Sequence, residues 1–228
     1  MKPYKAILVV LAVLLLDQAL KIWCKTHMML EDEITITHWF KIHFVENAGM
    51  AFSMELPTRW GKILLRLFRL IAVVAGTIYI KGLFDKKAHG GLIIASSVIL
   101  AGAIGNLLDG AFYGILFSDS FGRVAEFLPK GGGYAGFMQG DVVDMLRFPL
   151  YHGFLPRWIP FWGGEYFEFF NAIFNISDAA IAVGVFDIII FQKELFNKEP
   201  LETIVEESPV TPLQTEENPS SDLPSFPS

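Results

Sequence analysis

The chain has 228 residues, of which 53% are hydrophobic and 18% are charged, and its mean hydropathy is +0.44. Soluble domains carry about 25% charged residues, so lipid is the expected solvent for much of this chain. The net charge of −6 arises in residues 199–228, which hold seven acids and no Lys or Arg. No basic cluster with interleaved aromatic residues is present, which argues against nucleic acid as a partner.

Four apolar stretches are each long enough to cross a hydrocarbon core of about 30 Å, which takes roughly 20 helical residues. They cover approximately residues 6–23, 63–84, 91–108 and 172–191. Lysines lie before the first stretch, between the second and third, and after the fourth, which predicts that both termini are cytoplasmic. A basic stripe at the start of the second stretch is interpreted as a face that snorkels to the lipid headgroups: Arg59, Lys62, Arg66 and Arg69.

Two long segments, at about residues 24–61 and 110–171, are expected on the extracytoplasmic side. The first contains a partly alternating run at 34–45, which favours a strand. Beyond residue 198 the chain is rich in Pro, Ser and Glu, which is typical of disorder. The sequence therefore predicts an all-α membrane protein in residues 1–198, with four transmembrane helices, a small extracytoplasmic β element and an extracytoplasmic insertion. Residues 199–228 are expected to form a disordered acidic cytoplasmic tail.

Polar residues within or beside apolar spans are costly and often functional. Asp17 and Lys21 stand four residues apart with the acid first, which favours an ion pair on one helix face. A structural pair is the simplest interpretation, because pairing leaves neither group free for chemistry. After the expected strand, Gly49 permits a tight turn, and Asn47 can both donate and accept hydrogen bonds.

The end of the third span combines small and polar residues. Gly102 and Gly105 permit another helix to approach closely. Asn106 and Asp109 follow on a shared face. A carboxylate suits a helix N-terminus better than a C-terminus, so the position of Asp109 slightly favours a functional role over helix capping.

Asp144 and Asp178 both lie among apolar residues, and Asn175 stands three residues before Asp178. If two such carboxylates meet, they cannot both ionise at low cost, and a shared proton makes one a general base and the other a general acid. Two unrelated polar residues are the plainer alternative, which these patterns leave open. Neither a His-Glu-x-x-His zinc motif nor a Gly-x-Ser-x-Gly elbow occurs.

Five short motifs, taken in chain order, resemble those of the lipoprotein signal peptidases, also called type II signal peptidases. The resemblance covers about residues 5–192, and its strength lies in the order of the motifs on four spans. The motifs are Asp17-Gln18-x-x-Lys21, Glu46-Asn47-x-Gly49-x-Ala51-Phe52, Gly102-x-x-Gly105-Asn106-x-x-Asp109, Val142-Val143-Asp144 and Phe174-Asn175-x-x-Asp178.

The resemblance implies a prolipoprotein signal peptidase of the bacterial inner membrane, an aspartic endopeptidase that cuts just before a diacylglyceryl-modified cysteine. Asp144 and Asp178 would activate the water, close to the extracytoplasmic face. Seven other residues would bind substrate or order the site: Asp17, Lys21, Asn47, Gly49, Asn106, Asp109 and Asn175. The implied partners are prolipoprotein substrates and membrane lipid. No metal and no organic cofactor are implied, and a monomer is expected.

The chain departs from this family in two places. The family usually carries Arg directly after the Asp at position 109, where this chain has Gly110, and the segment 112–140 is longer than the usual link. One hypothesis joins the two departures: the insertion is a mobile cover hinged at residues 131–133, and its Arg123 pairs with Asp109. The alternative is a surface loop with a solvated Arg123.

Two other functions compete with peptidase activity. A small ion- or proton-coupled transporter would use Asp17, Asp109 and Asp178 as relays, although the lack of internal repeats and the long outer segments argue against it. A non-catalytic scaffold would use the acidic tail to bind partners.

Overall fold

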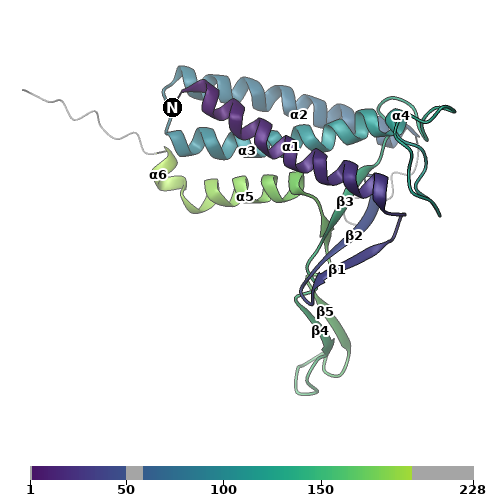
Figure 1. Ribbon diagram of the computed structural model, residues 1–228. Coiled ribbons are helices and arrows are strands. Elements are labelled where there is room, and N and C mark those ends of the chain that lie inside the picture. The colour runs from purple at the N-terminus through teal and green to yellow at the C-terminus, as the bar shows by residue number, and fades with distance from the viewer. Residues whose placement is uncertain (1, 50–58, 197–228) are drawn as a thin grey trace, which may run out of the picture. The chain divides into compact units, whose positions relative to one another are not determined.

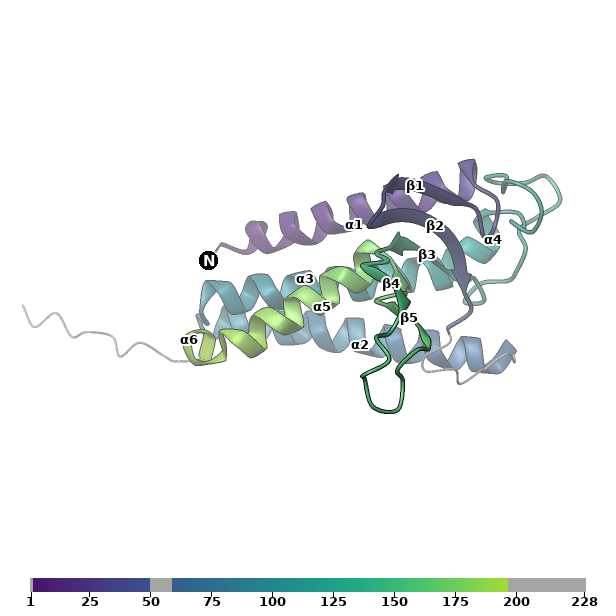
Figure 2. The same ribbon diagram turned by 90° about the horizontal axis from the view of Figure 1, so that it is seen from below.

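The computed structural model of the protein describes residues 2–49 and 59–196. Three helices in this part of the chain are long and apolar enough to cross a membrane: Pro3–His27, Trp60–Asp85 and Gly90–Leu116. They run side by side, and the β-strands gather toward one end of them (Figures 1 and 2). The tail expected at 199–228 lies outside the described residues.

The first two spans are single helices, and the third is a helix with an irregular end. The spans are α1 (Pro3–His27), α2 (Arg59–Asp85) and α3 (Gly90–Leu108). Proline in the first turn of α1 suits a helix start, where its missing N–H is not needed. Helix α3 continues through one π-helical turn, η1 (Asp109–Tyr113), into α4 (Gly114–Leu116). Such a turn often marks a functional site.

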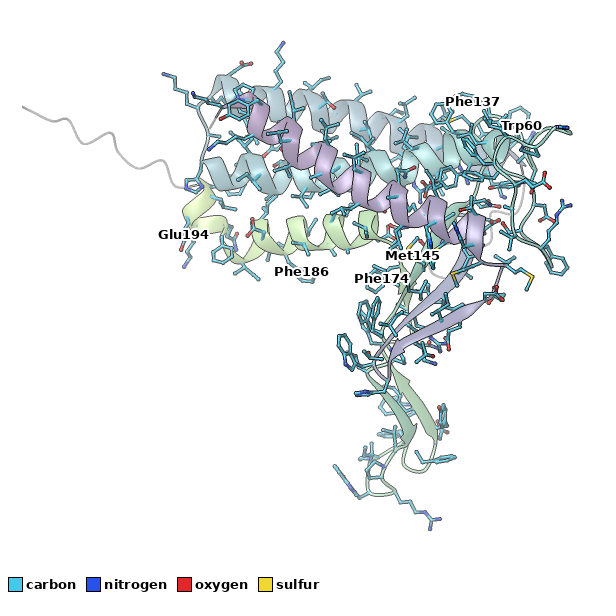
Figure 3. All side chains as sticks on the ribbon, viewed as in Figure 1. Trp60, Phe137, Met145, Phe174, Phe186 and Glu194 are labelled. Atoms are coloured by element: carbon cyan, nitrogen blue, oxygen red, sulfur yellow. The ribbon has the colours of Figure 1, made fainter. Side chains whose placement is uncertain are left out.

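The C-terminal part of the described chain contains α5 (Ile176–Ile190) and α6 (Gln192–Phe196). Helix α5 is apolar and packs along α3, and its Phe186 points away from the other helices (Figure 3). It has 15 residues, fewer than the roughly 20 that a helix needs to cross the hydrocarbon core. The fourth transmembrane helix expected at 172–191 and the all-α class are therefore not confirmed.

Strands from both outer segments, and β6 from the start of the fourth apolar stretch, form one antiparallel sheet in the order β1-β2-β3-β6. The strands are β1 (Glu33–Thr37), β2 (Phe40–Asn47), β3 (Val142–Arg147) and β6 (Ile173–Phe174). The run at 34–45 is extended as expected, but it forms two antiparallel strands, β1 and β2, with a turn at 38–39 between them. A separate hairpin pairs β4 (Tyr151–Phe154) with β5 (Tyr166–Phe169).

A buried apolar cluster fastens the sheet to the helix ends. Phe44, Val143 and Met145 of the sheet pack with Cys24 of α1 and Tyr113 of η1. Figure 3 shows Met145 and Phe174 where the sheet meets the helices. Burial of large apolar side chains contributes about 1.5–3 kcal/mol each, so this cluster fixes β3 relative to α1 and α3.

The insertion at 112–140 folds back on its own start. Ala135 N donates to Gly114 O at 2.9 Å, and Gly140 N donates to Gly110 O at 3.0 Å. A Cβ atom at Gly133 would lie only 2.1 Å from Gly114 O, so this glycine allows the backbone to pack closely. The backbone therefore holds both ends of the insertion against η1 and α4.

Candidate active site

Asp144 lies in β3, with only 5% of its surface exposed. It stands opposite Val45 of β2, and Asn47 of the same strand donates from Nδ2 to Asp144 Oδ2 at 3.2 Å. Asn47 Oδ1 in turn accepts from Gly49 N at 2.9 Å. Gly49 has φ +101°, a backbone conformation that glycine adopts readily.

Asp178 lies in the first turn of α5, beyond the capping residue Asn175. Asn175 Oδ1 accepts from Asp178 N at 2.8 Å, which satisfies one unpaired N–H of the helix start. Its Nδ2 donates to Asp144 Oδ1 at 2.6 Å. One buried amide therefore ties Asp144 to the helix turn that carries Asp178.

Asn106 of α3 supplies the second link between these groups. Its Nδ2 donates to Asp178 Oδ1 at 2.7 Å. Its Oδ1 accepts from Asn175 Nδ2 at 3.1 Å and from Lys21 Nζ at 3.1 Å. Both the amide nitrogen and the amide oxygen of Asn106 thus form hydrogen bonds within the candidate site.

Lys21 is a fully buried cation between two fully buried carboxylates. Its Nζ lies 2.8 Å from Asp17 Oδ2 and 2.7 Å from Asp109 Oδ2. The ion pair expected at Asp17 and Lys21 is therefore confirmed. Asp109 also accepts from Gln18 Nε2 at 2.9 Å, and Asp17 Oδ1 accepts from Ser177 N at 2.8 Å. These bonds join α1, η1 and the start of α5.

The two glycines of α3 allow α5 to reach this position. A Cβ atom at Gly102 would lie 2.2 Å from Ser177 O, and one at Gly105 would lie 2.0 Å from Ser177 Oγ. Atoms that close cannot coexist with an alanine unless α5 moves. The expected close approach of a helix at Gly102 and Gly105 is therefore confirmed.

The surroundings of Asp144 favour its neutral form. Burial, and next the charge of Asp178, raise the pKa of Asp144 to about 7, against hydrogen bonds from Asn47 and Asn175 that lower it. A carboxyl group with such a pKa can hold a proton near neutral pH. The geometry thus joins a carboxyl group able to donate a proton to a second carboxylate.

The basic stripe of α2 is not a snorkelling face throughout, because Arg66 is fully buried. Its Nη1 donates to Lys62 O at 2.9 Å, and its Nη2 donates to Gly140 O. Lys62 Nζ lies 2.6 Å from Asp141 Oδ1. The helical spacing placed these cations on one face, but it could not show that the face meets the start of β3.

Arg69 lies one turn further along α2. Its charge is within electrostatic range of Asp178, Asp109 and Asp144. Its Nη1 is buried and has no hydrogen-bond partner among the described residues. Sequence reasoning included Arg69 in the stripe but did not associate it with the site.

Lys25 is a second fully buried lysine, which the sequence did not single out. It pairs with Glu46 of β2 and donates to Ser120 Oγ at 3.2 Å. Its Nζ also lies 4.8 Å from the ring centre of Tyr134. The end of α1 is thereby joined to both outer segments.

The pairing of Arg123 with Asp109 is wrong. Arg123 is exposed, and its Nε donates to Asp119 O at 3.3 Å. Asp109 is fully buried and is bound by Lys21 and Gln18 instead.

Known protein families and sequences include relatives of this chain. The family model described as signal peptidase (SPase) II matches residues 9–193. A lipoprotein signal peptidase from Porphyromonas gingivalis is 44% identical over 191 residues, which is 82% of this chain and 83% of the relative. Another from Amoebophilus asiaticus is 32% identical over 205 residues, covering 88% and 82%.

Solved structures show a similar fold. A bacterial membrane enzyme determined by the in meso method at 2.3 Å has a TM-score of 0.52 and 24% identity, covering 88% of this chain and 94% of that one. A second, at 1.9 Å, has a TM-score of 0.53 and 23% identity, covering 86% and 96%. The matches do not favour a transporter. With its long apolar helices, this multi-pass membrane protease belongs to the signal peptidase II family, the lipoprotein signal peptidases.

Proposed function

We propose that the protein removes signal peptides from prolipoproteins by cutting before a diacylglyceryl-modified cysteine, with Asp144 and Asp178 as the catalytic pair. The observation that carries the mechanism is the position of Asn175, which binds Asp144 and caps the helix turn of Asp178. The relatives named lipoprotein signal peptidase support the substrate class.

The two carboxyl groups divide the work. Asp144, with its raised pKa of about 7, holds the shared proton, and Asp178 takes a proton from water. The water oxygen bonds to the scissile carbonyl carbon while Asp144 donates its proton to the carbonyl oxygen. Collapse of the intermediate breaks the C–N bond. The leaving nitrogen receives the proton held by Asp178, and one hydroxyl of the intermediate returns a proton to Asp144, which restores the starting state.

The network around the pair orders the site. Lys21 offsets the charges of Asp17 and Asp109, and Asn106 orients Asp178. Asn47 and its turn at Gly49 orient Asp144. Rigid support of this kind keeps reacting groups within the narrow geometry that catalysis needs.

We further place the protein in the bacterial inner membrane with four spans, α5 being the last. Lysines at one end of the spans favour cytoplasmic termini. Asp178 lies in the first turn of α5, at the opposite end of that helix from Lys193, and Asp144 is bonded to the same turn through Asn175. The site then lies near the extracytoplasmic face. No partner besides substrate and lipid is required.

The proposal is tested with purified enzyme and a diacylglyceryl-modified prolipoprotein, using mass spectrometry to locate the cut. Asp144→Asn and Asp178→Asn are each expected to reduce the rate by orders of magnitude. Asp187→Asn, at the far end of α5, is the matched control and should cleave normally. A single variant that keeps more than about a tenth of the rate, a loss under ~1.4 kcal/mol, would show that the pair is wrongly assigned.

A further inference from the structure

The β4–β5 hairpin carries an unusual concentration of exposed aromatic side chains. Phe161 is 93% exposed, Trp158 is 80% exposed and Phe154 is 72% exposed. Trp162 and Tyr166 are 61% and 60% exposed. Soluble surfaces rarely gather so many large apolar side chains without a partner, and a lone two-stranded hairpin is marginally stable in water. This surface therefore needs a cover.

The direction of the hairpin relative to the spans indicates what covers it. It leaves the helices near the start of α5 and runs across their axes, clear of the other described elements (Figures 1 and 2). Helices α1, α2 and α3 are the candidate spans, so their axes follow the membrane normal. An element that crosses those axes at one end of α5 extends along the membrane surface.

A ladder of rings makes the hairpin continuous with the sheet and with the start of α5. Phe148, just before β4, stacks on Phe40 with centroids 4.9 Å apart and on Phe174 at 5.6 Å. Phe174 also meets Phe170, just after β5, at 6.1 Å. Both strands of the hairpin are therefore anchored at their base, where the apolar surface of α5 begins.

The charge of the hairpin tip favours lipid over a charged protein partner. Between Phe154 and Tyr166 the charged residues are one base, Arg157, and one acid, Glu165. The tip has no net charge with which to attract an oppositely charged surface. Trp and Tyr, with an apolar ring and a polar N–H or O–H, prefer the boundary between headgroups and acyl chains.

We propose that the β4–β5 hairpin is an interfacial arm, whose aromatic tip inserts into the lipid headgroup region beside the active site. The arm joins the lipid surface to the sheet that carries Asp144, and so fixes the depth of this carboxyl group in the membrane. This role does not depend on the chemistry proposed for Asp144 and Asp178.

The test places a spin label at the tip, through Phe161→Cys, in nanodiscs of phosphatidylcholine. Collision rates with oxygen, which enters lipid, and with a water-soluble nickel chelate are then compared. Lys130→Cys, in the insertion at 112–140 and also exposed, is the matched control. Cys24 is fully buried, and labelling of the unmodified chain measures any background reaction there.

The arm predicts an oxygen-to-nickel collision ratio severalfold higher at position 161 than at position 130. Adding Trp158→Ser and Trp162→Ser should lower the ratio at 161 toward that of the control. Ready access of nickel to position 161 would place the tip in water and overturn the proposal. Protection from both reagents would also overturn it, because the tip would then be covered by protein, and label–label broadening would identify a second copy.

Discussion

Arg66 of α2 lies across Gly110 of η1. A Cβ atom at Gly110 would come within 2.7 Å of Arg66 Nε and 2.9 Å of its Cγ. The guanidinium is held by the carbonyl oxygens of Gly140 and Lys62, so the stem cannot swing away without losing these bonds. Where arginine was expected next to Asp109, the chain has a glycine and brings a guanidinium from another helix.

Replacing Gly110 with alanine is expected to destabilise the protein by about 1–3 kcal/mol, the usual cost of overpacking. Thermal unfolding in detergent measures the effect. Gly131→Ala is the control, since a Cβ atom there meets open space. If Arg66 is the cause, the cost of Gly110→Ala should shrink in an Arg66→Ala background. An equal cost in both backgrounds would assign the strain to another contact.

Alanine at Gly102 is expected to lower cleavage at least tenfold, a loss of about 1.4 kcal/mol in the barrier. The new Cβ atom would collide with the backbone oxygen of Ser177, so α5 must shift and carry Asp178 with it. Initial rates on a lipid-modified substrate provide the measurement. Gly82→Ala, in α2 with nothing within 4 Å, should retain the normal rate. Full activity in Gly102→Ala would show that α5 does not have to pack this closely.

Loss of the cation at Lys21 should cost about 3–5 kcal/mol of folding stability, as expected when one partner of a buried charge pair is removed. Lys21→Met leaves Asp17 and Asp109 buried without their shared cation. Adding Asp109→Asn should recover part of the unfolding temperature, because one buried charge is then gone. A double variant no more stable than Lys21→Met would refute this account.

The alkaline side of the pH profile should report Asp144. As the proposed acid, with a raised pKa of about 7, it loses its proton as pH rises, so kcat/KM should fall above about pH 7. Asn47 donates to the carboxylate and lowers the pKa of Asp144. In Asn47→Ala this pKa rises and the fall should begin at higher pH. If the alkaline fall of kcat/KM begins at the same pH in Asn47→Ala as in the unmodified enzyme, Asp144 is not the titrating acid.

Local spacing was enough to predict several parts of the site. The four-residue step from Asp17 to Lys21 is a property of the helix itself, and small residues at Gly102 and Gly105 permit few other uses than close packing. Asp178 stands out by its apolar setting, and Asn175 by its place three residues before it. Each of these contacts forms within one helix or where two helices cross. The spacing of residues along a helix is therefore enough to predict it.

Contacts between distant elements could not be predicted in this way. Snorkelling and burial produce the same helical stripe, so Arg66 was misassigned, and nearness in sequence misled the choice of Arg123 as a partner for Asp109. The register of β3, which brings Asp144 to Asn47, depends on pairing between residues 97 positions apart in the sequence. The hairpin at 151–169 could not be predicted from the sequence, because periodicity does not distinguish a short apolar strand from other short apolar runs.

The bonds made by Asn175 also impose an order on biosynthesis. Peptide synthesis proceeds from the N-terminus, so Lys21, Asn106 and Asp144 are made before Asn175 and Asp178 exist. The two carboxyl groups can meet only once α5 has docked against Gly102 and Gly105. A nascent chain halted before that helix therefore lacks both Asn175 and Asp178, and the proposed catalytic site stays incomplete until synthesis has passed them.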